Sequence, residues 1–154
     1  MTLEELSELF KQKGLTLGSV ESFTGGSFAS KITSIPGASK FFKGALVTYW
    51  TEAKNNVLGI SKEITDKYGV VSKEVAYLMA ESGKRLLNVD YCVSFTGNAG
   101  PEAMENKPVG EVFLAIASKD IEVYEYHLKG TRKDIQEAAI SLIIEEISKK
   151  LKKM

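Results

Sequence analysis

Cysteine and histidine are almost absent from the sequence, which contains only Cys92 and His127 among its 154 residues. A single cysteine cannot form an internal disulfide, which excludes a disulfide-stapled fold. One cysteine and one histidine also provide too few soft ligands for an ordinary structural zinc site. The sequence therefore offers no obvious metal cluster, and we expect no metal; no cofactor is expected either. Cys92 is expected to be a small buried side chain, and His127 a surface or edge residue without a role.

The sequence also lacks net charge and long apolar runs. Lys plus Arg and Asp plus Glu number 20 each, so the formal net charge is zero. This balance argues against broad electrostatic binding to nucleic acid or to an anionic membrane. No apolar run approaches the roughly 20 residues that span a bilayer, and acidic side chains precede the first lysine, unlike in a secretory signal. We expect a cytoplasmic protein with no membrane partner and no direct nucleic-acid partner.

Proline is scarce too, with three residues, and no Pro/Gly/Ser-rich linker, low-complexity stretch or clear repeat divides the chain. Apolar residues make up 44% of the sequence and charged residues 26%, close to the average for globular proteins. A chain of this length and composition is expected to form one domain that covers residues 1–154.

Helical and strand patterns alternate along the chain. Helices are expected at residues 2–13, 26–34, 52–59, 61–69, 72–87 and 131–151, and strands at 15–21, 42–50, 90–96, 109–117 and 121–129. Thr51 is the expected cap of the helix at 52–59. Only three residues separate the last two strands, which predicts a hairpin and therefore a mixed sheet. The predicted fold is α/β, a three-layer α/β/α sandwich around about five strands.

The first candidate site is the segment 21–26, Glu-Ser-Phe-Thr-Gly-Gly, where a strand ends and a helix begins. Gly25 and Gly26 allow backbone N–H groups to approach a ligand, and the helix N-terminus adds partial positive charge. Ser22 could be a nucleophile facing an oxyanion site, or could hydrogen-bond a phosphate. In the alternative reading, which this motif alone favours, Ser22 or Thr24 only caps the helix.

The second candidate site is the pair Tyr49 and Lys54, at a strand end and in the first turn of the next helix. The helix dipole disfavours a charged lysine there, and burial would lower its pKa, so that a neutral Lys54 could act as a base. Serine with lysine is a known alternative to serine with histidine. The alternative is that Lys54 is a solvated surface charge. Trp50 is either a core residue or a pocket wall.

The third candidate site is the glycine-interrupted loop after a strand, made of Thr96–Pro101, with Gly97 and Gly100, and then Lys107–Gly110. This loop could close over a ligand, or could be an ordinary rigid turn. Arg132 stands at the start of the last helix, where the dipole repels it but where an arginine can hold a phosphate. A solvated arginine is the alternative.

Together these segments resemble the CinA C-terminal domain family, which includes the stand-alone nicotinamide-nucleotide amidases. The resemblance extends from about Leu9 to Leu151. The segments that carry it are Glu21–Gly26, Pro36–Ser39, Val47–Tyr49, Glu52–Lys54, Gly69–Ser72, Thr96–Pro101 and Lys107–Gly110. The sequence departs from the family pattern at Phe23, where a small residue is usual, and at Asn98, where an apolar residue is usual. The stretch 102–106 is shorter and lacks a glycine pair.

The resemblance implies a three-layer α/β/α fold and the hydrolysis of nicotinamide mononucleotide to nicotinate mononucleotide and ammonia. It also implies a serine nucleophile assisted by Lys and Tyr, without a metal, and these roles fall on Ser22, Lys54 and Tyr49. Family members commonly self-associate, so a homo-oligomer is expected. The residues predicted to bind the pyridine nucleotide are Glu21, Thr24, Gly25, Gly26, Thr96, Gly97, Gly100 and Arg132.

In the mechanism expected from the sequence, neutral Lys54 takes the Ser22 proton, with Tyr49 as a candidate relay. Backbone N–H groups of the turn 24–26 stabilise the oxyanion, and Arg132 with the 97–100 backbone holds the 5′-phosphate. Two rival functions stay open. One is a non-catalytic ligand-binding or protein-interaction module linked to competence or DNA damage, and the other is a hydrolase of a different small amide or nucleotide.

Overall fold

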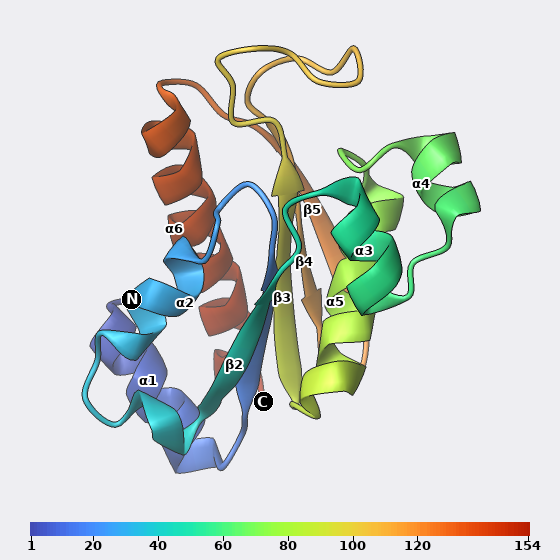
Figure 1. Cartoon of the computed structure of the whole chain (residues 1–154). Helices are drawn as coiled ribbons and strands as arrows, with labels where there is room; N and C mark the ends of the chain where they lie inside the picture. Colours follow the sequence, from blue (N-terminus) through green and yellow to red (C-terminus); the bar gives the residue numbers. More distant parts are fainter.

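The computed structural model describes all residues from 1 to 154 as a five-stranded sheet with helices on both faces (Figure 1). The strands are β1 Leu17–Glu21, β2 Phe42–Val47, β3 Tyr91–Gly97, β4 Glu111–Ala117 and β5 Ile121–His127. The helices are α1 Leu3–Lys13, α2 Ser27–Thr33, α3 Thr51–Leu58, α4 Lys62–Tyr68, α5 Lys73–Leu87 and α6 Arg132–Lys152, with a short 3-10 helix at Ala38–Lys40.

The sheet has the strand order β2-β1-β3-β4-β5 and is mixed, as the sequence predicts. Strands β2, β1 and β3 are parallel. Strand β4 runs antiparallel to β3, and the hairpin of β4 and β5 confirms the interpretation of the short 118–120 connection. The three parallel strands therefore end at one edge of the sheet, where ligands commonly bind in open α/β sheets.

Two hydrophobic cores lie on opposite faces of the sheet and make the three layers. Helices α1, α2 and α6 cover one face, over a cluster of 23 buried residues that includes Phe10, Phe28 and Ile143. Helices α3, α4 and α5 cover the other, over a cluster of 14 that includes Val75 and Met79. Figure 1 shows the two helix layers on either side of the sheet. The expected α/β/α sandwich is confirmed.

Three connections meet at the edge where the parallel strands end. They are the turn 22–26 after β1, the turn 48–50 after β2, and the loop 98–110 between β3 and β4, which arches over this end of the sheet in Figure 1. These are the three places that the sequence singles out. The first turn of α6 reaches the same edge, because Arg132 contacts both Tyr49 and Gly100.

The helix caps show where side-chain chemistry sets the ends of elements. Ser61, Ser72 and Thr131 cap α4, α5 and α6 by accepting backbone N–H bonds, as expected for Ser and Thr. The prediction for Thr51 is wrong, because α3 already begins there, and its N-cap residue, Trp50, makes no side-chain cap bond. No helix of the chain is both long enough and apolar enough to cross a bilayer.

Candidate active site

The turn that carries Ser22 is held by the carboxylate of Glu21. This side chain is 0% exposed, and its two oxygens accept five hydrogen bonds. The donors are the hydroxyls of Ser19 and Thr24 and the amides of Gly26, Phe28 and Ala29, at 2.8–3.1 Å. A carboxylate at a helix N-terminus satisfies otherwise unpaired N–H groups and complements the helix dipole. Glu21 thus does the capping that the sequence could assign to Ser22 or Thr24.

Because Ser22 is not needed as a cap, its hydroxyl is free to meet Lys54. The Nζ atom of Lys54 lies 2.9 Å from Ser22 Oγ, 2.6 Å from the Thr48 carbonyl and 3.3 Å from the Tyr49 carbonyl. Lys54 is 0% exposed, although it stands in the first turns of α3. The two carbonyls belong to the turn 48–50 that ends β2, so this turn fixes the position of the amine.

The environment of Lys54 disfavours its charged form. Burial lowers the pKa of the Lys54 ammonium from 10.5 to about 8, and the carboxylate of Glu105 acts in the opposite direction. A neutral amine has two N–H donors, which match the two carbonyls, and one lone pair, which can accept the Ser22 proton. The three oxygens around Nζ therefore suit both protonation states of Lys54. The ammonium donates to all three, whereas the neutral amine donates to the two carbonyls and accepts a hydrogen bond from Ser22. This arrangement is a serine–lysine dyad of the kind that activates a nucleophile.

The hydroxyl of Tyr49 is turned away from this dyad. It accepts a hydrogen bond from Arg132 Nη2 at 2.7 Å, and Arg132 Nη1 donates to the Gly100 carbonyl at 2.6 Å. What Tyr49 gives to Lys54 is its backbone carbonyl. The geometry does not support the predicted relay through the Tyr49 hydroxyl, and it places Arg132 as a bridge between two loops.

The loop 98–110 is fixed by its own polar groups. Asn98 is buried and accepts from the Gly100 amide while its side-chain amide donates to the Lys107 carbonyl, which explains a polar residue at this position. Glu105 reaches across to the segment before α5 and accepts hydrogen bonds from the Val70 and Val71 amides at 2.9 and 3.0 Å. The short stretch 102–106 is therefore tied down by one carboxylate.

A pocket of about 410 Å³ opens in front of the dyad, within the range of about 300–1,000 Å³ common for small-molecule sites. Trp50 at its wall is 72% exposed. Phe23 is 3% exposed and packs edge-on against Phe95, so its ring belongs to the core and does not fill the pocket. The lining residues are Ser22, Phe23, Tyr49, Trp50, Thr51, Glu52, Val70, Thr96, Gly97, Ala99, Met104 and Arg132.

The backbone N–H groups beside Ser22 differ in whether they have an acceptor within the protein. Gly25 donates to the Ser22 carbonyl at 3.0 Å, and Gly26 donates to Glu21. The amides of Phe23 and Thr24 have no acceptor within the protein. Of the donors predicted at 24–26, Gly25 and Gly26 are therefore already bonded within the protein, and the amides without a partner are those of Phe23 and Thr24.

The predicted site residues divide into two groups in the structure. Ser22, Tyr49, Thr96, Gly97 and Arg132 line the pocket, and Lys54 lies directly behind Ser22. The remaining predicted residues support the loops: Glu21, Thr24, Gly25, Gly26 and Gly100. The geometry does not support Glu21 as a substrate ligand, because its oxygens are already occupied.

Two groups that shape the site carry no signal in the sequence, namely Glu105 and the Thr48 carbonyl. Glu105 lies in a loop without periodicity, and its partners are backbone amides 34 and 35 residues away. No local pattern marks such a contact. The Thr48 carbonyl acts through the main chain, so its side chain gives no signal.

Comparison with known proteins shows the family of the chain. The CinA C-terminal domain family matches residues 2–151. A relative from Bacillus subtilis (strain 168), provisionally named a competence-damage inducible protein, is 45% identical over 135 residues, covering 87% of this chain and 32% of the relative. A relative of the same name from Bacillus cereus is 42% identical, over 96% of this chain and 36% of its own. The chain spans about one third of the length of these relatives.

Solved structures show the same fold. The competence damage-inducible protein A from Klebsiella pneumoniae has a TM-score of 0.94 at 26% identity, covering 97% of this chain and 94% of its own. The competence/damage inducible protein CihA from Agrobacterium tumefaciens has a TM-score of 0.89 at 30% identity, covering 94% and 90%. Similarity therefore extends over nearly the whole chain in both cases.

Proposed function

Because the chain belongs to the CinA C-terminal domain family, we propose that it is a nicotinamide-nucleotide amidase that converts nicotinamide mononucleotide to nicotinate mononucleotide and ammonia. One observation carries this proposal: the 2.9 Å contact between Ser22 Oγ and the buried amine of Lys54, at the wall of an open pocket. The dyad needs no metal or redox group to hydrolyse an amide.

In the acylation step, the neutral Lys54 amine takes the Ser22 proton as Oγ attacks the carboxamide carbon. The carbonyl oxygen becomes an oxyanion, for which the unpaired amides of Phe23 and Thr24, directly after the serine, are the candidate donors. One such donor is worth roughly 3 kcal/mol of the barrier. The Lys54 ammonium then returns the proton to the departing nitrogen, the C–N bond breaks, and ammonia leaves an ester on Ser22.

In the deacylation step, water takes the place of ammonia beside Lys54. The amine removes one proton from the water, the oxygen attacks the ester carbon, and a second oxyanion forms at the same amides. Collapse of this intermediate breaks the bond to Ser22 Oγ, which recovers its proton from Lys54. The carboxylic acid product ionises, and the dyad returns to its starting state.

Arg132 is the cation best placed to bind the 5′-phosphate of the substrate. Its guanidinium lines the pocket and uses two N–H groups on Gly100 and Tyr49. Five donors are available in a guanidinium, so three are left for an anion. The exposed ring of Trp50 is available to pack on the pyridine ring or the ribose.

The direct test is ammonia release by the purified protein from nicotinamide mononucleotide, nicotinamide riboside and free nicotinamide. We expect hydrolysis of the mononucleotide, weaker hydrolysis of the riboside and none of nicotinamide, because the phosphate contributes to binding. Equal rates for all three would contradict a phosphate site. No ammonia from a folded protein would favour the rival reading of a non-catalytic binding or interaction module.

The pH profile should report the titration of Lys54. Since only the neutral amine accepts the Ser22 proton and its pKa is about 8, kcat/KM should rise as pH increases through about 8. At pH 7 only about one tenth of the amine is neutral. Removing the charge of Glu105, which raises this pKa, should move the midpoint to lower pH in Glu105→Gln.

The matched control for this profile is Glu102→Gln, which removes an exposed charge from the same loop. Its midpoint should coincide with that of the wild type. A midpoint that stays fixed in Glu105→Gln would show that another group controls the rate.

Arg132→Gln should raise the KM for nicotinamide mononucleotide by about ten- to a hundredfold, equivalent to about 1.4–2.8 kcal/mol of binding. The expected effect on nicotinamide riboside is small, because that substrate has no phosphate to lose. Steady-state kinetics on both substrates distinguishes phosphate binding by Arg132 from a role in holding the loops. Arg85→Gln on α5 is the control, being the chain's other arginine and exposed. An equal increase in KM for both substrates would show that Arg132 holds the loops and does not bind the phosphate.

A further inference from the structure

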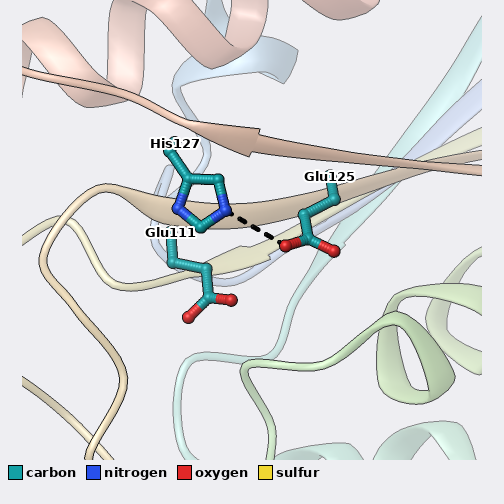
Figure 2. A group of neighbouring side chains, drawn as sticks. All are labelled: Glu111, Glu125 and His127. Atoms are coloured by element: carbon teal, nitrogen blue, oxygen red, sulfur yellow. Dashed lines mark hydrogen bonds and ion pairs between the residues drawn. The ribbon is translucent and has the colours of Figure 1, made fainter.

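Three side chains with metal-binding groups converge on one face of the β4–β5 hairpin (Figure 2). Glu111, the first residue of β4, pairs directly with His127, the last residue of β5. Glu125 precedes His127 by two residues and therefore projects from the same face of the strand. One ligand atom of each residue lies within 4.8 Å of the others. Two adjacent strands of a hydrogen-bonded hairpin hold all three.

Neither glutamate of this group forms an ion pair with a lysine or an arginine. The one partner of Glu125 among the ion pairs of the structure is His127 Nε2 at 3.1 Å. Two carboxylates close together, neither of them ion-paired with a lysine or an arginine, attract a cation. Glu125 and His127 are exposed and Glu111 half-buried, so an ion from solvent can reach them.

We propose that Glu111, Glu125 and His127 bind one divalent transition-metal ion of the zinc class. Each glutamate supplies one carboxylate oxygen and His127 supplies one ring nitrogen, leaving at least one position for water. Zinc binds such atoms at about 2.0–2.2 Å in tetrahedral geometry, so two ligand atoms of one ion are about 3.3–3.6 Å apart. The three ligand atoms lie within 4.8 Å of one another, so that a rotation of the exposed Glu125 side chain would bring them to this separation.

The donor set selects the class of ion. An imidazole suits zinc, copper, nickel and iron, whereas magnesium and calcium prefer sites made of oxygen alone. The ion would displace the hydrogen bond between His127 and Glu125, which already brings these two groups together. Absence of thiolate ligands separates this site from the cysteine-rich structural zinc sites that the sequence excludes.

The site is separate from the serine–lysine dyad and does not depend on the proposed amidase function. None of its residues lines the pocket in front of Ser22. It lies at the foot of the loop 98–110, because the Asn98 amide donates to the Glu111 carbonyl at 3.0 Å. A bound ion would fix the end of the hairpin from which this loop departs.

The experiment is a titration of the whole, tag-free chain with zinc chloride, followed by NMR of the imidazole nitrogens. His127 is the chain's only histidine, so its signals need no assignment by mutation. The titration is run at about pH 7.5, because the neutral imidazole is the form that binds a metal. The variants are Glu111→Gln and Glu125→Gln, with Glu81→Gln on the exposed side of α5 as the charge-matched control.

We expect one ring-nitrogen signal to shift and to saturate near one zinc per chain. Outer-shell partners alone are worth about 10–100-fold in metal affinity, so losing either carboxylate ligand should weaken binding at least about tenfold. The Glu81→Gln variant should behave as the wild type. Unmoved ring signals in excess zinc would overturn the proposal. Equal zinc affinity in the wild type and the three variants would also overturn it, because zinc would then bind the histidine alone. Unchanged amide spectra establish that the variants are folded.

Discussion

Ser22→Ala and Lys54→Met should each reduce kcat for amide hydrolysis by about 10³-fold or more, the scale of loss seen when one member of a nucleophile–base pair is removed. The serine supplies the attacking oxygen, and the lysine is the only basic side chain bonded to it, at 2.9 Å. Ammonia release under substrate saturation is the measurement. The double variant should be no slower than either single variant, because the two residues act as one unit.

Two matched controls separate this effect from general damage. Ser27→Ala changes a serine in the first turn of α2, and Lys62→Met changes an exposed lysine in the first turn of α4. Both should keep activity within a few-fold of the wild type. A Ser22→Ala protein that still releases ammonia would show that water, not serine, attacks the amide.

The Lys54→Met variant should also change how the free energy of unfolding depends on pH, an effect that is independent of catalysis. The folded-state pKa of about 8 lies below the 10.5 of the unfolded chain, so burial of the ammonium destabilises the wild type below pH 8 by about 3 kcal/mol. Wild-type stability should therefore rise between pH 8 and 10.5, whereas that of Lys54→Met should not. Urea unfolding at pH 7 and pH 10 measures the difference. Parallel pH profiles would contradict the lowered pKa.

The layered fold follows from the sequence because it rests on local signals. The alternation of helical and strand patterns, and the three-residue link at 118–120, predict the sandwich and its hairpin. The three places where strands meet polar turns also converge, because parallel strands end at one edge of a sheet. Among the site residues, Lys54 has the clearest local signal. A lysine in the first turn of a helix is disfavoured by the helix dipole, which indicates an environment that lowers its pKa.

The features that the sequence does not predict depend on contacts between distant segments. The sequence places the Tyr49 hydroxyl beside Lys54, but this hydroxyl binds Arg132, 83 residues away. Gln136 similarly donates to the Phe23 carbonyl across 113 residues. The carboxylate of Glu105 finds two amides just before α5. Such pairs depend on how loops pack, which neither periodicity nor spacing encodes.

Replacing Glu21 should produce the largest loss of stability of any single change around the site. We expect Glu21→Gln to cost about 3 kcal/mol or more, because hydrogen bonds to a charged acceptor are worth about 1.5–3 kcal/mol each. Glutamine keeps the shape but turns one acceptor oxygen into an N–H₂ group, which then faces either the Ala29 amide or the Gly26 and Phe28 amides. For a chain of this size the loss corresponds to about 6–12 °C in Tm.

Thermal unfolding and amide hydrogen exchange together test this account. Exchange at Gly26, Phe28 and Ala29 should accelerate in Glu21→Gln, since these amides lose their acceptor, whereas Glu81→Gln should leave both Tm and exchange unchanged. An unaltered Tm would mean that α2 does not need the carboxylate. A lower Tm without faster exchange at these three amides would show that the loss of stability arises elsewhere in the core. Because α2 has seven residues and its N-cap, Gly26, offers no side-chain bond, Glu21 is the group that holds the turn and leaves the Ser22 hydroxyl free for Lys54.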